Sequence, residues 1–215
     1  MIIAIDGPSG AGKGTVAKKL AKKLNFTYID TGAMYRCIAL KTLRENIDIS
    51  DTDKIVNIAK KVDIRLTNDG MCYLDEEDVS NEIRTMKVTQ RVSKISLITP
   101  LREVMRELQR AYAKKDNIVM EGRDITTAVF KDADYKFYLD ASIEVRAERR
   151  YKENIEKQIE CTYETIKQSI MDRDYDDEHR VDGKLMRTEE QIYINSDNMT
   201  IDEVVNYMLE KIEVK

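Results

Sequence analysis

Cysteine, proline and histidine are scarce in this sequence: its 215 residues include three cysteines, two prolines and one histidine. The cysteines, Cys37, Cys72 and Cys161, are odd in number and more than thirty residues apart. That spacing fits neither a disulfide framework nor a metal-knuckle motif, so we predict no protein metal site and expect buried or incidental thiols in a reducing compartment.

Long apolar runs are also missing. No stretch approaches the roughly 18–20 apolar residues that span a bilayer. The segment Met1 to Asp6 leads directly into a glycine-rich stretch and carries neither a basic leader nor a signal-peptide core. We therefore expect a soluble, cytoplasmic protein with no membrane partner.

An excess of one charge sign is absent too, because 36 Lys and Arg stand against 40 Asp and Glu, a net charge of -4. No overall field attracts a polyanion, which argues against a general nucleic-acid binder. A small phosphorylated substrate needs only a few converging basic side chains, so the arginines have to be judged by their positions.

What the chain does contain is an alternation of short apolar strands and amphipathic helices. Strands are expected at 2–5, 26–29, 118–120, 133–139 and around Ile192 and Ile194. Helical spacing of apolar residues follows at 16–24, 34–43, 55–62, 88–95, 101–112, in two charged helices within 142–174 broken near Cys161 and Thr162, and after Thr200. This pattern predicts an α/β fold with a five-stranded parallel sheet flanked by helices and ligands at the carboxyl ends of its strands.

The stretch from Asp63 to Ser80 departs from that alternation. Two short strands flank Asn68-Asp69-Gly70, a turn sequence that suits positive φ. We expect a β-hairpin here. Since 42% of the chain is apolar and no flexible linker or repeat interrupts it, one domain over residues 1–215 is expected.

A glycine-rich loop lies between the first expected strand and the first expected helix, which is the context of a P-loop. Its backbone N–H groups and the helix N-terminus suit phosphate, and Lys13 is placed to bridge the β- and γ-phosphates. Gly14 stands where the strict pattern has Ser or Thr, and Thr15 follows it. The loop predicts NTP binding by Gly7, Pro8, Ser9, Gly10, Ala11, Gly12, Lys13, Gly14 and Thr15. GTPases, motors, transport ATPases and small-molecule kinases share such loops.

Further motifs follow in order along nearly the whole chain: residues 30–36 (DTGAMYR), 78–85 (DVSNEIRT), Ser93, 100–102 (PLR), 109–110 (QR), 121–124 (EGRD), and Arg173-Asp174 with Asp177 and Arg180. Together with the hairpin they resemble the bacterial cytidylate kinases, a family of P-loop nucleoside monophosphate kinases. The resemblance implies transfer of the γ-phosphoryl group of ATP to CMP or dCMP, with Mg²⁺. It also implies a core (1–30, 116–141, 188–215), an acceptor-binding lobe with the hairpin insert (about 31–115) and a helical lid (about 142–187). We expect a monomer, since the sequence shows no long exposed apolar stripe that would indicate a subunit interface.

The resemblance also assigns site residues. Thr31, Arg36 and Arg123 match positions that hold the acceptor phosphate. Ser93, Arg102 and Asp124 match those that read the cytosine edge, and Arg173, Asp177 and Arg180 match sugar and phosphate contacts. The catalytic set that we predict is Lys13, Arg123, Arg149, Arg150 and Arg173. An arginine taken singly often forms an ion pair with a surface carboxylate and has no role in binding. This alternative is less favoured for an arginine that lies inside a family motif.

Phosphoryl transfer depends on positioning and on cations around the moving group. The acceptor phosphate has a second pKa of about 6, is mostly a dianion at neutral pH, and needs no general base. A chain with one histidine can therefore catalyse it, and we interpret His179 as a surface residue. Arg146, Arg149 and Arg150 share one helical face that can close over ATP. Glu144, Glu148 and Glu153 leave open a solvated, salt-bridged helix instead.

Two segments differ from the family pattern: Gln158 replaces a usual glycine, and 181–185 (VDGKL) replaces a usual Pro-Leu segment. Rival interpretations are a kinase for UMP, AMP or shikimate, a P-loop protein that uses nucleotide as a switch, and a nucleic-acid binder through the basic run from Arg146 to Lys152. The hairpin and the set Ser93, Arg102, Asp124 argue against another acceptor.

Overall fold

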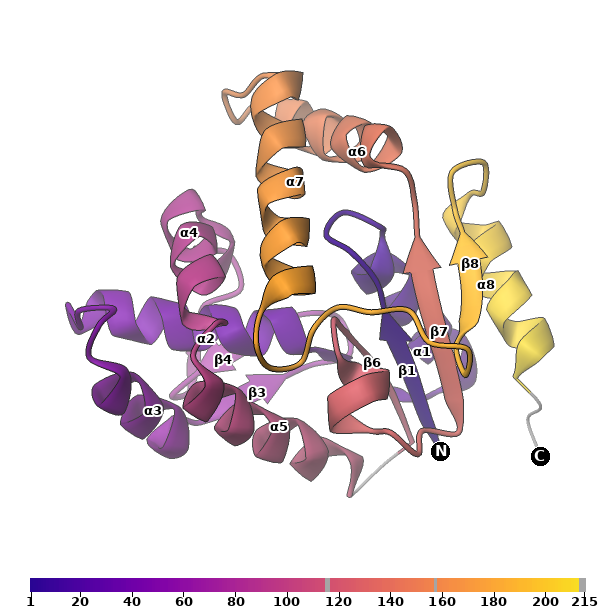
Figure 1. The fold of residues 1–215 in the computed structure, drawn as a ribbon. Coiled ribbons are helices and arrows are strands. Elements are labelled where there is room, and N and C mark those ends of the chain that lie inside the picture. The colour runs from indigo at the N-terminus through magenta and orange to yellow at the C-terminus, as the bar shows by residue number, and fades with distance from the viewer. Residues whose placement is uncertain (115–116, 157, 213–215) are drawn as a thin grey trace.

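A twisted parallel sheet forms the centre of the protein in the computed structural model, which describes residues 1–114, 117–156 and 158–212 (Figure 1). Its five strands run in the order β2-β6-β1-β7-β8. They are β1 (Ile2–Asp6), β2 (Thr27–Asp30), β6 (Ile118–Gly122), β7 (Tyr135–Asp140) and β8 (Ile192–Asn195). The sequence prediction of a five-stranded parallel sheet is confirmed.

Helices cover both faces of the sheet. Ile3 and Ile5 of β1 point to α1 (Lys13–Leu24) and α8 (Ile201–Lys211), and all of these lie in one apolar core. Ala4 points the opposite way, toward α2 (Thr31–Arg44), because successive strand residues face opposite sides. A parallel sheet buried on both faces therefore divides the core into two layers.

The second core layer continues into a group of helices on one side of the molecule (Figure 1). These are α2, α3 (Thr52–Lys61), α4 (Met86–Ile95), α5 (Thr99–Ala113) and a 3-10 turn at Glu82–Arg84. Pro100 lies in the first turn of α5, where its missing N–H costs nothing. The boundary expected between the acceptor lobe and the core, at 115–116, lies outside the described residues.

The predicted β-hairpin is confirmed, and the insert adds a third strand to it. They are β3 (Ile64–Leu66), β4 (Cys72–Leu74) and β5 (Glu77–Asp78), antiparallel in that order. Gly70 supplies the expected positive φ of 87°. A second tight turn contains Asp75 and Glu76, with φ values of 49° and 70°. The sequence has no Gly or Asn at these two positions to indicate a turn with positive φ. Lys41 and the backbone N–H of Asp63 both donate to the Asp75 carboxylate and hold this turn.

The two charged helices are α6 (Ile143–Glu156) and α7 (Tyr163–His179), beyond the carboxyl ends of the strands (Figure 1). Thr162 caps α7 with a capping box, at the break that the sequence predicts. Gln158, which replaces the family's glycine, has a φ of 56°, the conformation that glycine adopts most easily. After α7 the chain crosses in front of the sheet to reach β8, and we call residues 180–191 the strap.

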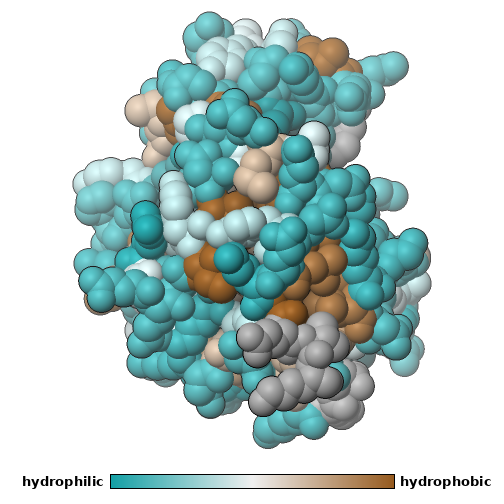
Figure 2. All heavy atoms as spheres, turned by 90° about the vertical axis from the view of Figure 1, so that its right-hand side faces the viewer, coloured by the Kyte–Doolittle hydropathy of each residue, from teal (hydrophilic) through white to brown (hydrophobic). Residues whose placement is uncertain are grey.

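Figure 2 shows the face that carries β8 and α8. Hydrophilic residues cover most of it, and hydrophobic ones gather in its lower half. Within the described ranges, no helix has the length and apolar character that crossing a bilayer requires.

Candidate active site

The glycine-rich loop connects β1 to α1, as the sequence predicts. Gly10 and Gly12 have φ values of 80° and 88°, which let the backbone curl. Lys13 opens α1 and is 5% exposed; its Nζ donates to the Pro8 carbonyl at 2.7 Å. Burial, and next the nearby Arg123, lower the pKa of Lys13 to about 7. Phosphate oxygens in the loop would restore full charge to this lysine, because an anion favours the protonated amine.

Three arginines meet at one carboxylate, that of Asp177 on α7: Arg123 follows β6, Arg173 lies on α7 and Arg180 is its C-cap. Its oxygens accept hydrogen bonds from Arg123 Nε at 2.8 Å, Arg173 Nε at 3.3 Å and Arg180 Nη1 at 3.1 Å. Burial alone would raise its pKa, but these three arginines outweigh burial and hold the pKa at about 2. Arg173 also donates to Ser93 Oγ on α4 at 3.0 Å, so the network spans the gap between α4 and α7.

The predicted base-reading residues form a second, connected pair. Arg102 on α5 donates to the Asp124 carboxylate at 2.7 Å and to the Ser96 carbonyl at 3.2 Å, with 2% of Arg102 exposed. Arg180 Nη2 lies 3.7 Å from Asp124 and is a buried donor without a hydrogen-bond partner. Asp124 therefore links this pair to the Asp177 network, and the pair has hydrogen-bonding groups available for a planar polar ligand.

The strap packs directly on this pair. A Cβ added at Gly183 would lie 2.2 Å from Asp124 Oδ2 and 2.3 Å from Arg102 Nη2, and φ at Gly183 is 61°. Asp182 binds Arg106 of α5, and its carboxylate is 3.6 Å from Arg102 Nε. The segment that departs from the family pattern thus has a glycine where its backbone approaches the Arg102–Asp124 pair.

Thr31 and Arg36 lie in the first two turns of α2, which begins next to the end of β6. Thr31 donates to the Glu121 carbonyl at 2.8 Å, and Arg36 donates to Asp30 at 2.8 Å. Asp30 also caps α2 through the Ala33 N–H. Arg36 is therefore held by the Asp30 carboxylate, and an acceptor phosphate would have to compete with Asp30 for it.

The predicted lid arginines have different environments. Arg149 donates to the Ser196 carbonyl at 2.7 Å, and Arg150 is half exposed and pairs with Glu153 at 3.1 Å. The salt-bridged alternative thus describes Arg150 in this conformation. Arg146 is 6% exposed and reaches the glycine loop, donating to the Ser9 carbonyl at 2.9 Å and to Asp174 at 2.5 Å.

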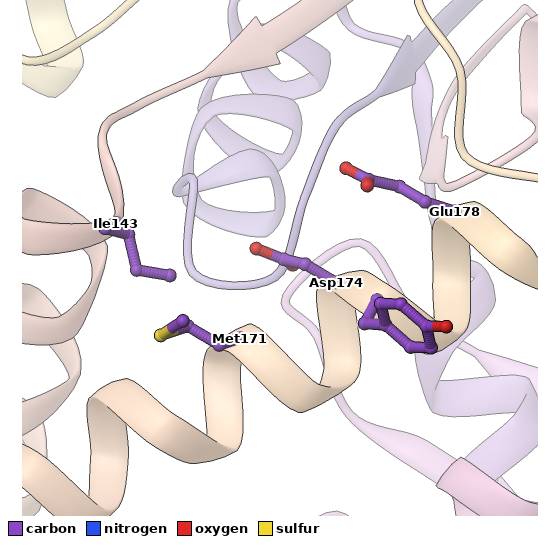
Figure 3. Close-up of a pocket in the computed structure, with 5 residues that line it drawn as sticks. Ile143, Met171, Asp174 and Glu178 are labelled. Carbon is purple, nitrogen blue, oxygen red and sulfur yellow. The ribbon is translucent and has the colours of Figure 1, made fainter.

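Asp174 also accepts from the Ser9 backbone N–H at 3.3 Å. Figure 3 shows it extending from α7 toward the glycine loop, at the edge of an open cavity of about 330 Å³ between α7 and the start of α6. A carboxylate on α7 therefore accepts from a backbone N–H of the glycine loop that could otherwise donate to a phosphate oxygen.

Sequence reasoning gave no role to three carboxylates that organise the site: Asp6 and Glu121, which are buried, and Asp30, which is partly buried. Asp6 ends β1 and accepts from the N–H groups of Ile125 and Thr126, both at 2.8 Å, which fixes the chain just after Asp124. Burial, and then the charge of Asp30, raise the pKa of Glu121 to about 7. Their positions at strand ends were the signal available, since ligands bind at that edge of a parallel sheet.

Among the described residues, no cluster of His, Cys, Asp and Glu is arranged to hold a metal ion by itself. Thr15 is exposed at the start of α1. Both Asp6 oxygens are occupied by hydrogen bonds. These residues fit a divalent cation held chiefly by phosphate oxygens of a nucleotide.

A glycine loop between the first strand and first helix, with Lys13 at its end and a central parallel sheet, defines a P-loop nucleotide-binding protein. Solved structures support the fold. A shikimate kinase from Bacteroides thetaiotaomicron matches with TM-score 0.52 at 15% identity, over 100% of this chain and 99% of that one. An uncharacterized protein from Eubacterium ventriosum matches with TM-score 0.56 at 14% identity.

The chain belongs to the cytidylate kinase family, whose family model matches residues 3–214. It is 51% identical over 210 residues to a cytidylate kinase from Caldanaerobacter subterraneus, covering 98% of this chain and 93% of that one. It is 43% identical over 213 residues to a cytidylate kinase from Fusobacterium nucleatum, covering 99% and 97%. The resemblance found in the sequence motifs is confirmed.

Proposed function

We propose that this protein transfers the γ-phosphoryl group of ATP to CMP or dCMP, giving ADP and CDP or dCDP. The observation that carries the proposal is the arginine network on Asp177, which continues through Asp124 to Arg102 and lies within electrostatic reach of Lys13. It supplies cations for two phosphates and a polar pair for a base in one continuous site.

On the donor side, residues 7–15 would hold the ATP phosphates through backbone N–H groups, and Lys13 would bridge the β- and γ-phosphates. Mg²⁺, bound with the nucleotide through phosphate oxygens, would supply positive charge that neutralises the phosphates. Asp174 would leave the Ser9 N–H as the phosphates enter, because both compete for that donor.

On the acceptor side, Thr31, Arg36 and Arg123 would hold the phosphate of CMP. Arg123 is tied to Asp177 through Nε and to the Gly122 carbonyl through Nη1, which leaves Nη2 for a ligand. The acceptor phosphate needs no base, since it is mostly a dianion at neutral pH. Catalysis then consists of holding two anions in line while the positive charges balance the transferring group.

Base selection is assigned to Ser93, Arg102 and Asp124. The Asp124 carboxylate can accept from the exocyclic amine of cytosine, and Arg102 can donate to ring acceptors. Uracil presents a carbonyl to the same carboxylate, which leaves a buried acceptor unmatched. Arg173, Asp177 and Arg180 would contact the sugar and the phosphates.

Arg149 and Arg150 belong to the proposal as groups that act on the transferring phosphoryl after the lid moves over ATP. Their bonds to Ser196 and Glu153 would have to break first. Arg150→Ala should then lower kcat by ~10³ or more, as loss of such arginines does. A kcat within threefold of wild type would remove Arg150 from the catalytic set.

The test of the proposal is release of ADP with a panel of acceptors: CMP, dCMP, UMP, AMP and shikimate, each at matched concentration. We expect ADP release to be fastest with CMP and dCMP. Preference for AMP, UMP or shikimate would overturn the substrate assignment, and ATP binding without any saturable site for CMP would overturn the kinase assignment.

We also propose the division into a core, an acceptor lobe (about 31–115) and a lid (about 142–187), with a monomer that works in the cytoplasm and binds no nucleic acid. The three free cysteines suit a reducing compartment. Sedimentation at micromolar concentration tests whether the protein is a monomer. Retention on immobilised RNA at low salt would contradict the proposal that it binds no nucleic acid.

A further inference from the structure

Two of the three cysteines meet in the core, although they are far apart in the sequence. Cys37 on α2 and Cys72 at the start of β4 are 35 residues apart, and their Sγ atoms lie 3.1 Å from each other. They are 0% and 2% exposed, while Cys161 lies apart from them in the loop between α6 and α7. The contact therefore joins the second turn of α2 to the insert sheet.

We propose that Cys37 and Cys72 are a modification site, a dithiol that a small peroxide oxidises to a disulfide tying α2 to the insert. The sulfur atoms must approach by about 1 Å to reach the S–S bond length of about 2.05 Å. Because the two sulfurs are already in contact, a small movement of this turn of α2 toward β4 supplies the remaining distance.

The two thiols are not equivalent. The hydrogen bond with Cys72 raises the pKa of Cys37, and the same hydrogen bond lowers the pKa of Cys72. We assign the attack on the peroxide to Cys72 because it lies on a short strand of the insert, whereas Cys37 lies inside α2, and the lowered pKa of Cys72 favours the same sulfur. Its sheet has three short strands, and we expect local opening of this sheet to admit a molecule as small as hydrogen peroxide.

The chemistry balances in two steps. The Cys72 thiolate displaces hydroxide from hydrogen peroxide, which becomes water on protonation, and leaves a sulfenic acid. The Cys37 sulfur then attacks the Cys72 sulfur, the S–S bond forms, and the sulfenic oxygen leaves as a second water molecule. Both sulfurs are oxidised and both peroxide oxygens are reduced, with Cys37 acting as the resolving thiol.

The bond affects the acceptor side of the site, because Arg36 directly precedes Cys37 on α2. Drawing Cys37 toward β4 shifts this turn of the helix relative to Asp30. We expect oxidation to lower kcat/KM for CMP by roughly 3- to 100-fold, as displacements near 1 Å do. This consequence rests on the proposed role of Arg36, whereas formation of the bond does not.

The experiment treats the full-length protein with hydrogen peroxide, blocks remaining thiols with N-ethylmaleimide under denaturing conditions, and maps tryptic peptides by mass. We expect residues 37–41 linked to residues 66–84, a loss of two hydrogen atoms, and a Cys161 peptide (158–167) that is still alkylated. Dithiothreitol should reverse the link. Closing a loop of this length should raise Tm by roughly 8–15 °C.

Cys161→Ser is the matched control and should oxidise like wild type. Cys37→Ala should trap a sulfenic acid on Cys72, detectable with dimedone. Preferential oxidation of Cys161, or separately alkylated Cys37 and Cys72 peptides after peroxide treatment, would overturn the modification site. A linked protein with unchanged kcat/KM for CMP would overturn its effect on the acceptor side while leaving the proposed kinase activity standing.

Discussion

Replacing Asp177 with asparagine tests whether one carboxylate holds the arginine network together. Asp177 is 2% exposed, and its pKa falls from 3.8 to about 2 because Arg123, Arg173 and Arg180 outweigh burial. At about 1.4 kcal/mol per pKa unit, that difference corresponds to about 2 kcal/mol of folding free energy at neutral pH. Leaving three arginines without their shared anion adds to the loss, for a total of about 3–5 kcal/mol.

The sign of the pH dependence follows from a lowered pKa in the folded state. The contribution of Asp177 is complete above its unfolded pKa of 3.8 and disappears as pH falls through about 2. The difference in unfolding free energy between wild type and Asp177→Asn should therefore be largest at neutral pH and should shrink between about pH 4 and pH 2.

Urea denaturation at several pH values measures this difference, and Tm at neutral pH should fall by roughly 5–20 °C. Glu178→Gln is the matched control, since the next residue on α7 is exposed and its neutralisation should change stability by at most about 0.5 kcal/mol. An Asp177→Asn protein as stable as the control, or a difference that stays constant with pH, would refute the reasoning.

Three further substitutions test the site residues. Lys13→Met should keep the circular dichroism spectrum of wild type and lower kcat by at least ~10²–10³, because it removes a cation from the phosphates and not from the core. Arg123→Ala should raise KM for CMP far more than the dissociation constant of ATP, measured by titration; equal losses would contradict the acceptor assignment. Asp124→Asn offers a hydrogen-bond donor to the uracil carbonyl. The ratio of kcat/KM for CMP to kcat/KM for UMP should therefore drop from a starting value as high as ~10⁴. An unchanged ratio would exclude Asp124 from base selection.

Local patterns in the sequence determined the elements and the donor site. Alternating apolar runs predicted the five strands, and the glycine loop was recognisable because its function resides in consecutive backbone groups. The second turn of the insert was missed, since Asp75 and Glu76 adopt positive φ with help from Lys41, a contact that turn propensities do not contain.

The sequence by itself determined which residue types enter the site, and the order of their motifs identified the family. Only the tertiary structure decided which side chains meet, because packing alone joins Arg123 to Asp177 across 54 residues and Ser93 to Arg173 across 80. The same holds for Arg146, which the sequence grouped with Arg149 and Arg150 on one helical face. Burial against the glycine loop separates it from them, and helical spacing does not encode what lies opposite each residue.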